Sequence, residues 1–128
     1  MTRTVLAPEQ IHPAIAARVG ALHADVVDEV RQAVASNRIV VVGMTLNPFP
    51  RKARRLLDQK GAPYRYLEYG SYFGQWRRRN ALKMWTGWPT MPMVFVNGLL
   101  IGGADDLARL IASGELDELI ARPYPVRS

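Results

Sequence analysis

Two short apolar runs joined by a tight turn constrain the fold of this chain more than any other feature. Residues 93–96 and residues 99–101 are apolar, and only Asn97 and Gly98 separate them. Asn-Gly readily adopts the two positive φ angles of a type I′ turn, which joins adjacent antiparallel strands. The segment therefore predicts a β-hairpin near the C-terminal third of the chain.

A strand, a helix and a second strand are predicted upstream of this hairpin. Residues 39–42 form a continuous β-branched run, which is typical of a strand buried on both faces. Residues 64–67 form the second strand. Because a helix lies between them, the two strands should be parallel and joined by a right-handed crossover. Together with the hairpin they predict a mixed four-stranded sheet flanked by helices, an α/β architecture of the thioredoxin type.

The helix inside this β-α-β unit has clear signals at both ends. Asn47 suits the N-cap and Pro48 suits the first helical position. Pro50 lacks an N–H, so the Asn47 side chain should accept a hydrogen bond from Phe49 instead. Gly61 is expected to end the helix.

Further helices complete the predicted order. Residues 8–35 form two helical pieces, and further helices are expected at about residues 75–85, 106–112 and 115–121. Asp105 or Ala104 should cap the helix at residues 106–112. We expect residues 1–23 to form an N-terminal helical extension and residues 24–128 to form the main domain.

The absence of cysteine restricts the chemistry of the chain. With 128 residues and no cysteine, it has no thiol nucleophile, no disulfide and no sulfur of its own for an iron–sulfur cluster. The two histidines, His12 and His23, have no ligand cluster beside them, so no metal site is predicted. No apolar run reaches the length needed to cross a bilayer, and we expect a cytoplasmic protein without a membrane partner.

The positive charge is concentrated in the body of the chain. The net charge is +6, and residues 37–128 contain fourteen basic and seven acidic side chains. This balance favours anionic partners. Arg51, Lys52, Arg54 and Arg55 form a basic run after Asn47, which is either a solvated helix face or an anion-binding surface.

Three segments, in order, resemble the glutaredoxin family. Residues 40–50 (VVVGMTLNPFP) resemble the strand and active-site loop that carries C-P-Y-C or C-G-F-S in the family. Residues 88–92 (WPTMP) resemble the W-P-T-x-P segment of its monothiol branch. Residues 97–105 (NGLLIGGAD) resemble its N-G-x-x-I-G-G-C-D segment. The resemblance implies a thioredoxin-like fold and covers residues 24–121.

The departures from the family pattern fall on its catalytic residues. Asn47 stands at the position of the nucleophilic cysteine, and Pro50 stands at the position of the second cysteine or serine. Met44 replaces a lysine that helps to bind glutathione, and Ala104 replaces a frequent cysteine or serine. The resemblance therefore implies a redox-inactive relative of the glutaredoxins.

Other residues of the chain resemble those that cradle glutathione in the family. The resemblance implies that Met91 and Pro92 form a cis-proline turn whose backbone pairs with the peptide of the ligand. It implies that Arg79 meets one carboxylate of the ligand and that the helix start at residues 103–105 receives the other. The sites implied for glutathione are Asn47, Arg79, Thr90, Met91, Pro92, Gly103, Ala104 and Asp105.

Three of these residues have a structural alternative. Asn47 is either a thiol-recognising group or a plain N-cap. Arg79 is either a ligand clamp or part of a solvated helix face, since Arg77 and Arg78 precede it directly. Asp105 is either the partner of a ligand amine or a helix cap.

Several functions remain open at this point. The first is a module that binds glutathione or an acidic or extended peptide, without a covalently bound cofactor. The second is a structural protein that dimerises or binds a protein through its N-terminal helix, with a vestigial glutathione site. A third is an enzyme that activates glutathione with Thr45 or Asn47. Binding of nucleic acid by basic and aromatic residues at positions 64–79 is disfavoured, because no nucleic-acid motif is present.

Overall fold

The structure is a computed structural model that describes residues 4–21, 24–70 and 74–123. A 3₁₀ turn at Pro8–Gln10 precedes α1 (Pro13–Ala21) and α2 (Ala24–Ser36). The central part contains β1 (Ile39–Gly43), α3 (Pro48–Lys60), β2 (Arg65–Glu68) and α4 (Trp76–Thr86). The last part contains β3 (Met93–Val96), β4 (Leu99–Gly102), α5 (Ala104–Ser113) and α6 (Glu115–Ala121).

The four strands form one mixed sheet in the order β2-β1-β3-β4. β1 runs parallel to β2, with Val41 opposite Tyr66, and antiparallel to β3, with Val41 opposite Val94. β3 and β4 form the hairpin, in which Asn97 has φ 49° and Gly98 has φ 80°. The predicted hairpin, the parallel pair and the mixed sheet are therefore confirmed.

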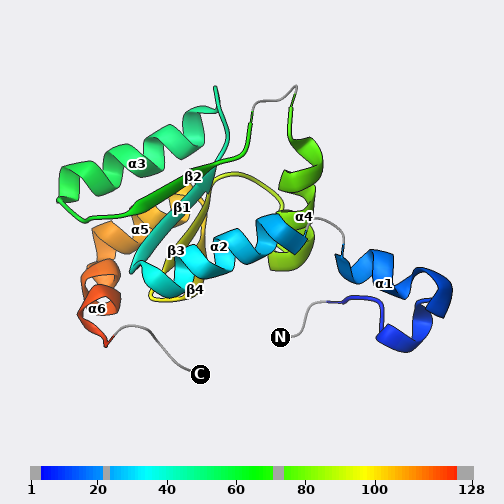
Figure 1. Cartoon of the computed structure of the whole chain (residues 1–128). Helices are drawn as coiled ribbons and strands as arrows, with labels where there is room; N and C mark the ends of the chain where they lie inside the picture. Colours follow the sequence, from blue (N-terminus) through cyan, green and yellow to red (C-terminus); the bar gives the residue numbers. More distant parts are fainter. Residues whose placement is uncertain (1–3, 22–23, 71–73, 124–128) are drawn as a thin grey trace.

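Helices cover both faces of this sheet (Figure 1). α2 and α4 lie on one face, over a core that includes Val30, Leu82 and Met93. α3, α5 and α6 lie on the other face, over a core that includes Leu57, Leu107 and Leu116. All five residues of β1 are buried, as expected for a strand between two apolar layers.

The helix caps agree with the sequence in α3 and differ in α5. Asn47 Oδ1 accepts a hydrogen bond from Phe49 N at 2.9 Å, and Gly61 closes the helix with φ 74°. The prediction that α5 starts at residue 106 with Asp105 or Ala104 as its cap was wrong. The helix starts at Ala104, and its N-cap is Gly103.

The N-terminal segment stands apart from the sheet. Figure 1 shows α1 beyond α4, separated from the layered body of the molecule. Four apolar side chains of this segment are exposed: Val5, Leu6, Ile15 and Val19. The predicted boundary at residue 23 lies outside the described residues, as do His23, Tyr72 and Phe73. Within the described ranges, no helix is both long enough and apolar enough to cross a membrane.

Candidate functional site

A groove of about 270 Å³ lies at one end of the sheet, where the turn before β3 meets the start of α5. It brings together six of the eight residues that the sequence pointed to. The residues that line it are Phe49, Trp88, Thr90, Met91, Pro92, Gly103, Ala104, Asp105 and Asp106. Segments from three separate parts of the chain therefore meet in one concave site.

The floor of the groove is the turn that leads into β3. The Met91–Pro92 peptide bond is cis, as predicted, and both residues are buried, whereas Thr90 is exposed. Trp88 packs close to Gly103, because a Cβ placed on Gly103 would lie 3.9 Å from the indole Nε1. That indole nitrogen is buried and has no hydrogen-bond partner. The turn and the start of α5 are thus in direct contact.

The other wall is the first turn of α5, which is held by an acidic residue that the sequence analysis did not select. Asp106 Oδ2 accepts a hydrogen bond from Gly103 N at 2.9 Å. Gly102 has φ 113°, and a Cβ there would lie 2.7 Å from Cγ of Asp106. A glycine is therefore required at 102 so that Asp106 can reach back over the chain. The first N–H groups of a helix have no intrahelical partner, which makes this wall suited to an anionic group.

Asp105 is turned to a different partner. Its Oδ1 accepts a hydrogen bond from Lys52 Nζ at 2.7 Å, which joins α5 to the first turns of α3. The Lys52 ammonium lowers the pKa of Asp105, first through this hydrogen bond and then through its charge. Asp105 is therefore an exposed carboxylate whose ammonium partner comes from within the protein.

Asn47 lies beside the groove but not in it. It lines a second hollow of about 140 Å³ with Thr45, Leu46, Arg54 and other residues of the loop after β1, of β2 and of α3. Because its carboxamide oxygen accepts from Phe49 N, the N-cap interpretation of Asn47 is confirmed. Thr45 and Asn47 thus share a hollow, whereas the cis-proline turn and α5 share the groove.

The basic run after Asn47 does not form one anion site. Lys52 pairs with Asp105, and the Arg54 guanidinium lies over the Tyr66 ring at 4.1 Å from its centroid. Arg51 and Arg55 are exposed. The pKa of Tyr66 rises to about 12, mainly through burial and then through its hydrogen bond to Glu68. The members of the run thus have separate surroundings.

Arg79 is a buried residue of α4. It is only 6% exposed, so the alternative of a solvated helix face was wrong. Its Nη1 donates to the carbonyl oxygens of Tyr69 and Gly74 at 2.8 and 2.6 Å, and it is absent from the lining of the groove. The carbonyl groups of Tyr69 and Gly74 thus converge on this guanidinium, and no local pattern in the sequence predicts that arrangement.

Two further features do not belong to the groove. A larger hollow of about 570 Å³ lies at the opposite end of the sheet, where Lys60 Nζ and Asp117 Oδ1 are paired at 2.7 Å. We give it less weight than the groove, because it gathers none of the residues that the motifs single out. Among the described residues, no cluster of three or more histidine or acidic side chains is arranged to hold a metal.

Comparison with known proteins agrees with the fold. Residues 39–101 match the family model of glutaredoxin. A glutaredoxin-like protein of Dictyostelium discoideum is 49% identical over 94 residues, which cover 73% of this chain and 76% of that protein. The chain belongs to the glutaredoxin family.

Solved glutaredoxins have the same architecture. The crystal structure of oxidised glutaredoxin 2 from Chlamydomonas reinhardtii is 34% identical and superimposes with a TM-score of 0.67, covering 77% of this chain and 92% of the other. Buckwheat glutaredoxin in complex with glutathione is 29% identical, with a TM-score of 0.68, over 78% of this chain and 91% of that one. Within this family the present glutaredoxin-related chain has no cysteine.

Sequence reasoning missed the roles of three residues in or beside the groove. Phe49 lines the groove, Asp106 caps α5 and Lys52 pairs with Asp105. Phe49 was signalled only by its place between two prolines, which fix its backbone at the helix start. The pairing of Lys52 depends on how α3 packs against α5, and no local pattern reports it.

Proposed function

We propose that this chain is a glutaredoxin-family module that binds glutathione, or an extended peptide related to it, without exchanging disulfides. The observation that carries the proposal is the groove, which gathers Thr90, the cis-proline turn and the start of α5 in one place. The buckwheat relative is known in complex with glutathione.

The chemistry of the groove suits this ligand. The exposed backbone at Thr90 precedes the buried turn, where an extended peptide can add main-chain hydrogen bonds. The start of α5 offers N–H groups to a carboxylate, and Asp105 offers a carboxylate to an ammonium. Both charged ends of a γ-glutamyl group thus have a partner at the start of α5. A role for Arg79 and Asn47 in contacting the ligand stays a prediction.

The absence of cysteine removes the usual reaction. Disulfide exchange requires a thiolate that attacks a disulfide sulfur, and the chain offers Asn47 at the expected position. We therefore expect redox inactivity and no iron–sulfur ligation by the chain's own residues. A rate above background in glutathione-coupled disulfide reduction would contradict this part. The cytoplasm as its place of action also stays a prediction.

The binding experiment uses two matched acidic residues. Asp105 and Asp117 are both exposed and each pairs with a lysine at 2.7 Å, but only Asp105 lines the groove. Reduced glutathione is titrated into the protein while backbone amides are followed by NMR. Saturable shifts at Thr90, Met91 and Gly103 are expected, with weaker binding in Asp105→Asn and unchanged binding in Asp117→Asn. Absence of shifts at millimolar glutathione would overturn the proposal.

A second candidate function rests on the N-terminal segment. Val5, Leu6, Ile15 and Val19 expose apolar surface on an element that stands apart from the sheet. A protein partner or a second copy would cover such a surface, whether or not glutathione binds. If a second copy covers it, light scattering after size exclusion should give a mass above the 14.3 kDa of one chain. The double variant Ile15→Ser/Val19→Ser should return to the mass of one chain, whereas Arg18→Ser should keep the higher mass. A monomer that captures no partner would exclude this function.

A further inference from the structure

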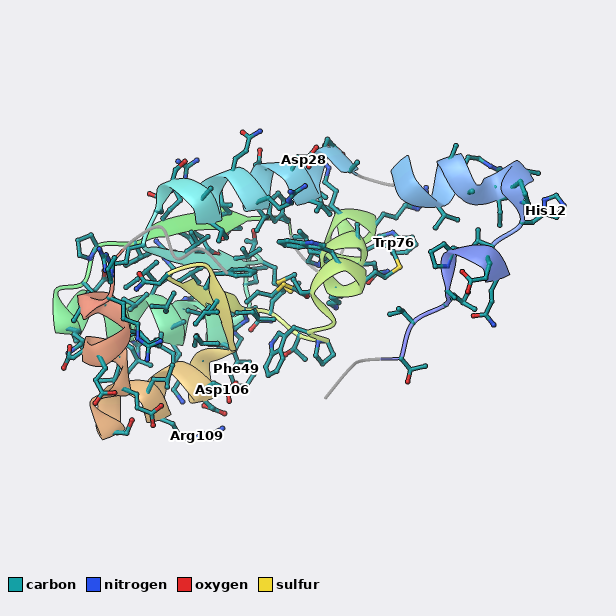
Figure 2. All side chains as sticks on the ribbon, turned by 90° about the horizontal axis from the view of Figure 1, so that it is seen from below. His12, Asp28, Phe49, Trp76, Asp106 and Arg109 are labelled. Carbon is teal, nitrogen blue, oxygen red and sulfur yellow. The ribbon has the colours of Figure 1, made fainter. Side chains whose placement is uncertain are left out.

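The apolar side chains beside the groove are unusually open to solvent. Leu46 is 71% exposed and Phe49 is 52% exposed, and they flank Asn47 in the loop and first turn of α3. Figure 2 shows Phe49 close to Asp106, at the start of α5, and both line the groove. Phe49 lines the groove and Leu46 lines the adjacent hollow beside Asn47, and we call these two side chains the apolar rim.

The backbone holds this rim in place. Pro48 and Pro50 lie on either side of Phe49, and the Asn47 side chain accepts a hydrogen bond from its N–H. Leu46 has φ 64°, a positive angle that a leucine rarely adopts. Proline restricts φ, so the loss of conformational entropy on binding is small at this position. The two apolar side chains are therefore presented to a ligand by a pre-ordered segment.

The same segment cannot form a disulfide with a thiol. The chain contains no cysteine, and the carboxamide oxygen of Asn47 is engaged by the helix. Free glutathione would cover less of Leu46 and Phe49 than an S-substituted peptide, because its sulfur carries only a hydrogen. A ligand with a larger apolar group at that point would cover them and would gain the free energy of removing both surfaces from water.

We infer that the preferred ligand is a γ-glutamyl peptide whose central side chain is a thioether or another apolar group, which packs on Phe49 and Leu46. This inference rests on the proposed function, because the charged ends of the ligand would occupy the groove as glutathione does. It differs in the class of ligand, because the protein would prefer γ-glutamyl peptides with a thioether or another apolar side chain over glutathione with its free thiol.

The experiment compares three probes by calorimetry: glutathione, S-methylglutathione and S-hexylglutathione. Binding should strengthen along this series, with S-hexylglutathione at least tenfold tighter than glutathione. In Phe49→Ser and in Leu46→Ser the advantage of S-hexylglutathione over glutathione, with both ligands measured on the same variant, should fall below threefold. Leu99→Ser is the matched control, since Leu99 is 45% exposed on β4 and lines no part of the groove.

Each outcome has a defined meaning. If glutathione binds and S-hexylglutathione binds no tighter, the inference fails and the proposed function stands. If none of the three probes binds, both fail. If the tenfold advantage survives in both serine variants, or if S-hexylcysteine binds equally well, the hexyl group binds elsewhere and the inference is again wrong. Circular dichroism and melting curves confirm that each variant is folded.

Discussion

Lys52 Nζ lies 2.7 Å from Oδ1 of Asp105, so an ammonium group of α3 forms an ion pair with a carboxylate of α5 at the edge of the groove. The two residues are 53 positions apart and belong to α3 and α5. In the proposed complex, the α-amine of a γ-glutamyl ligand would meet the same carboxylate. Lys52 therefore resembles the ligand's own ammonium and competes with it.

Lys52→Gln should change how strongly the ligand's amine contributes to binding. The comparison uses glutathione and an analogue that lacks the α-amine. Without Lys52, Asp105 has no internal ammonium, so the affinity ratio of glutathione to the analogue should rise roughly two- to five-fold, as expected for an exposed ion pair. Calorimetry on both ligands measures the ratio. An unchanged ratio would mean that the amine does not approach Asp105.

The same substitution should be visible without a ligand. Lys52 is the main cause of the lowered pKa of Asp105, and Arg109 contributes less. Lys52→Gln should therefore raise this pKa toward its usual value, and Arg109→Gln should raise it less. Carbon-detected NMR of the carboxyl group follows the titration. Because a lowered pKa stabilises the fold above the unfolded-state value, the wild type should lose this contribution as the pH falls through the Asp105 titration.

Arg79→Met should destabilise the fold, whatever Arg79 does for a ligand. The buried guanidinium donates hydrogen bonds to two backbone carbonyls, of Tyr69 and Gly74, and methionine leaves both without that donor. The expected loss is roughly 2–4 kcal/mol in the free energy of unfolding. Denaturation by urea measures it, with Arg77→Met, on the exposed side of α4, as the control. A loss below about 0.5 kcal/mol in Arg79→Met would refute a structural role.

Gly102→Ala should disturb the start of α5 selectively. Gly102 has φ 113°, and an added methyl group would collide with the Asp106 side chain that caps the helix. We expect a loss of about 2–4 kcal/mol from backbone strain and the broken cap together. Gly98→Ala is a control for the positive φ alone, because nothing lies within 4 Å of its added Cβ, and it should cost about 1–2 kcal/mol. Thermal and urea unfolding measure both losses. If Gly102→Ala and Gly98→Ala lose the same free energy of unfolding, the collision with Asp106 does not occur.

Tyr66 should make the protein sensitive to alkali. Burial and the hydrogen bond to Glu68 raise its pKa from the ordinary value of 10.0 to about 12. Since the folded state holds this proton more tightly than the unfolded state, the stability is complete below pH 10 and falls as the pH rises toward 12. The ultraviolet absorbance difference between wild type and Tyr66→Phe gives the pKa. Melting curves should then show a smaller alkaline loss in Tyr66→Phe than in the wild type.

The sequence predicted the parts of this molecule that depend on local rules. The Asn97-Gly98 turn, the Asn47 cap and the run of β-branched residues in β1 each specify backbone geometry over a few positions, and each was confirmed. The W-P-T-M-P and N-G-L-L-I-G-G segments located the groove because both lie beside strands of the hairpin.

The parts that escaped prediction depend on packing between distant elements. Asp105 and Asp106 both suit the first turn of a helix, and only the position at which α5 begins decides which one accepts a hydrogen bond from the N–H of the N-cap residue, Gly103. Three consecutive arginines give no sign of which one is buried, because the answer depends on where the backbone carbonyls of Tyr69 and Gly74 lie. The Lys52–Asp105 pair likewise requires the packing of α3 against α5.

Asn47→Cys tests whether the groove still presents glutathione to the position of the lost nucleophile. The new thiol would sit at the N-cap of α3, where the helix start lowers a thiol pKa. Its thiolate should attack one sulfur of glutathione disulfide, forming a mixed disulfide with the protein and releasing one reduced glutathione. Ser113→Cys is the control, because Ser113 is exposed in the last turn of α5, where the dipole opposes a thiolate.

The expected result is a rate with glutathione disulfide at least tenfold higher in Asn47→Cys than in Ser113→Cys, measured by mass spectrometry of the mixed disulfide. The ratio should shrink with 2-hydroxyethyl disulfide, which has no γ-glutamyl group to occupy the start of α5. If the ratio is the same for both disulfides, the helix start activates the thiol but the groove does not position glutathione. If Asn47→Cys reacts faster than Ser113→Cys with glutathione disulfide only, the groove still binds glutathione although Asn47 stands in place of a cysteine.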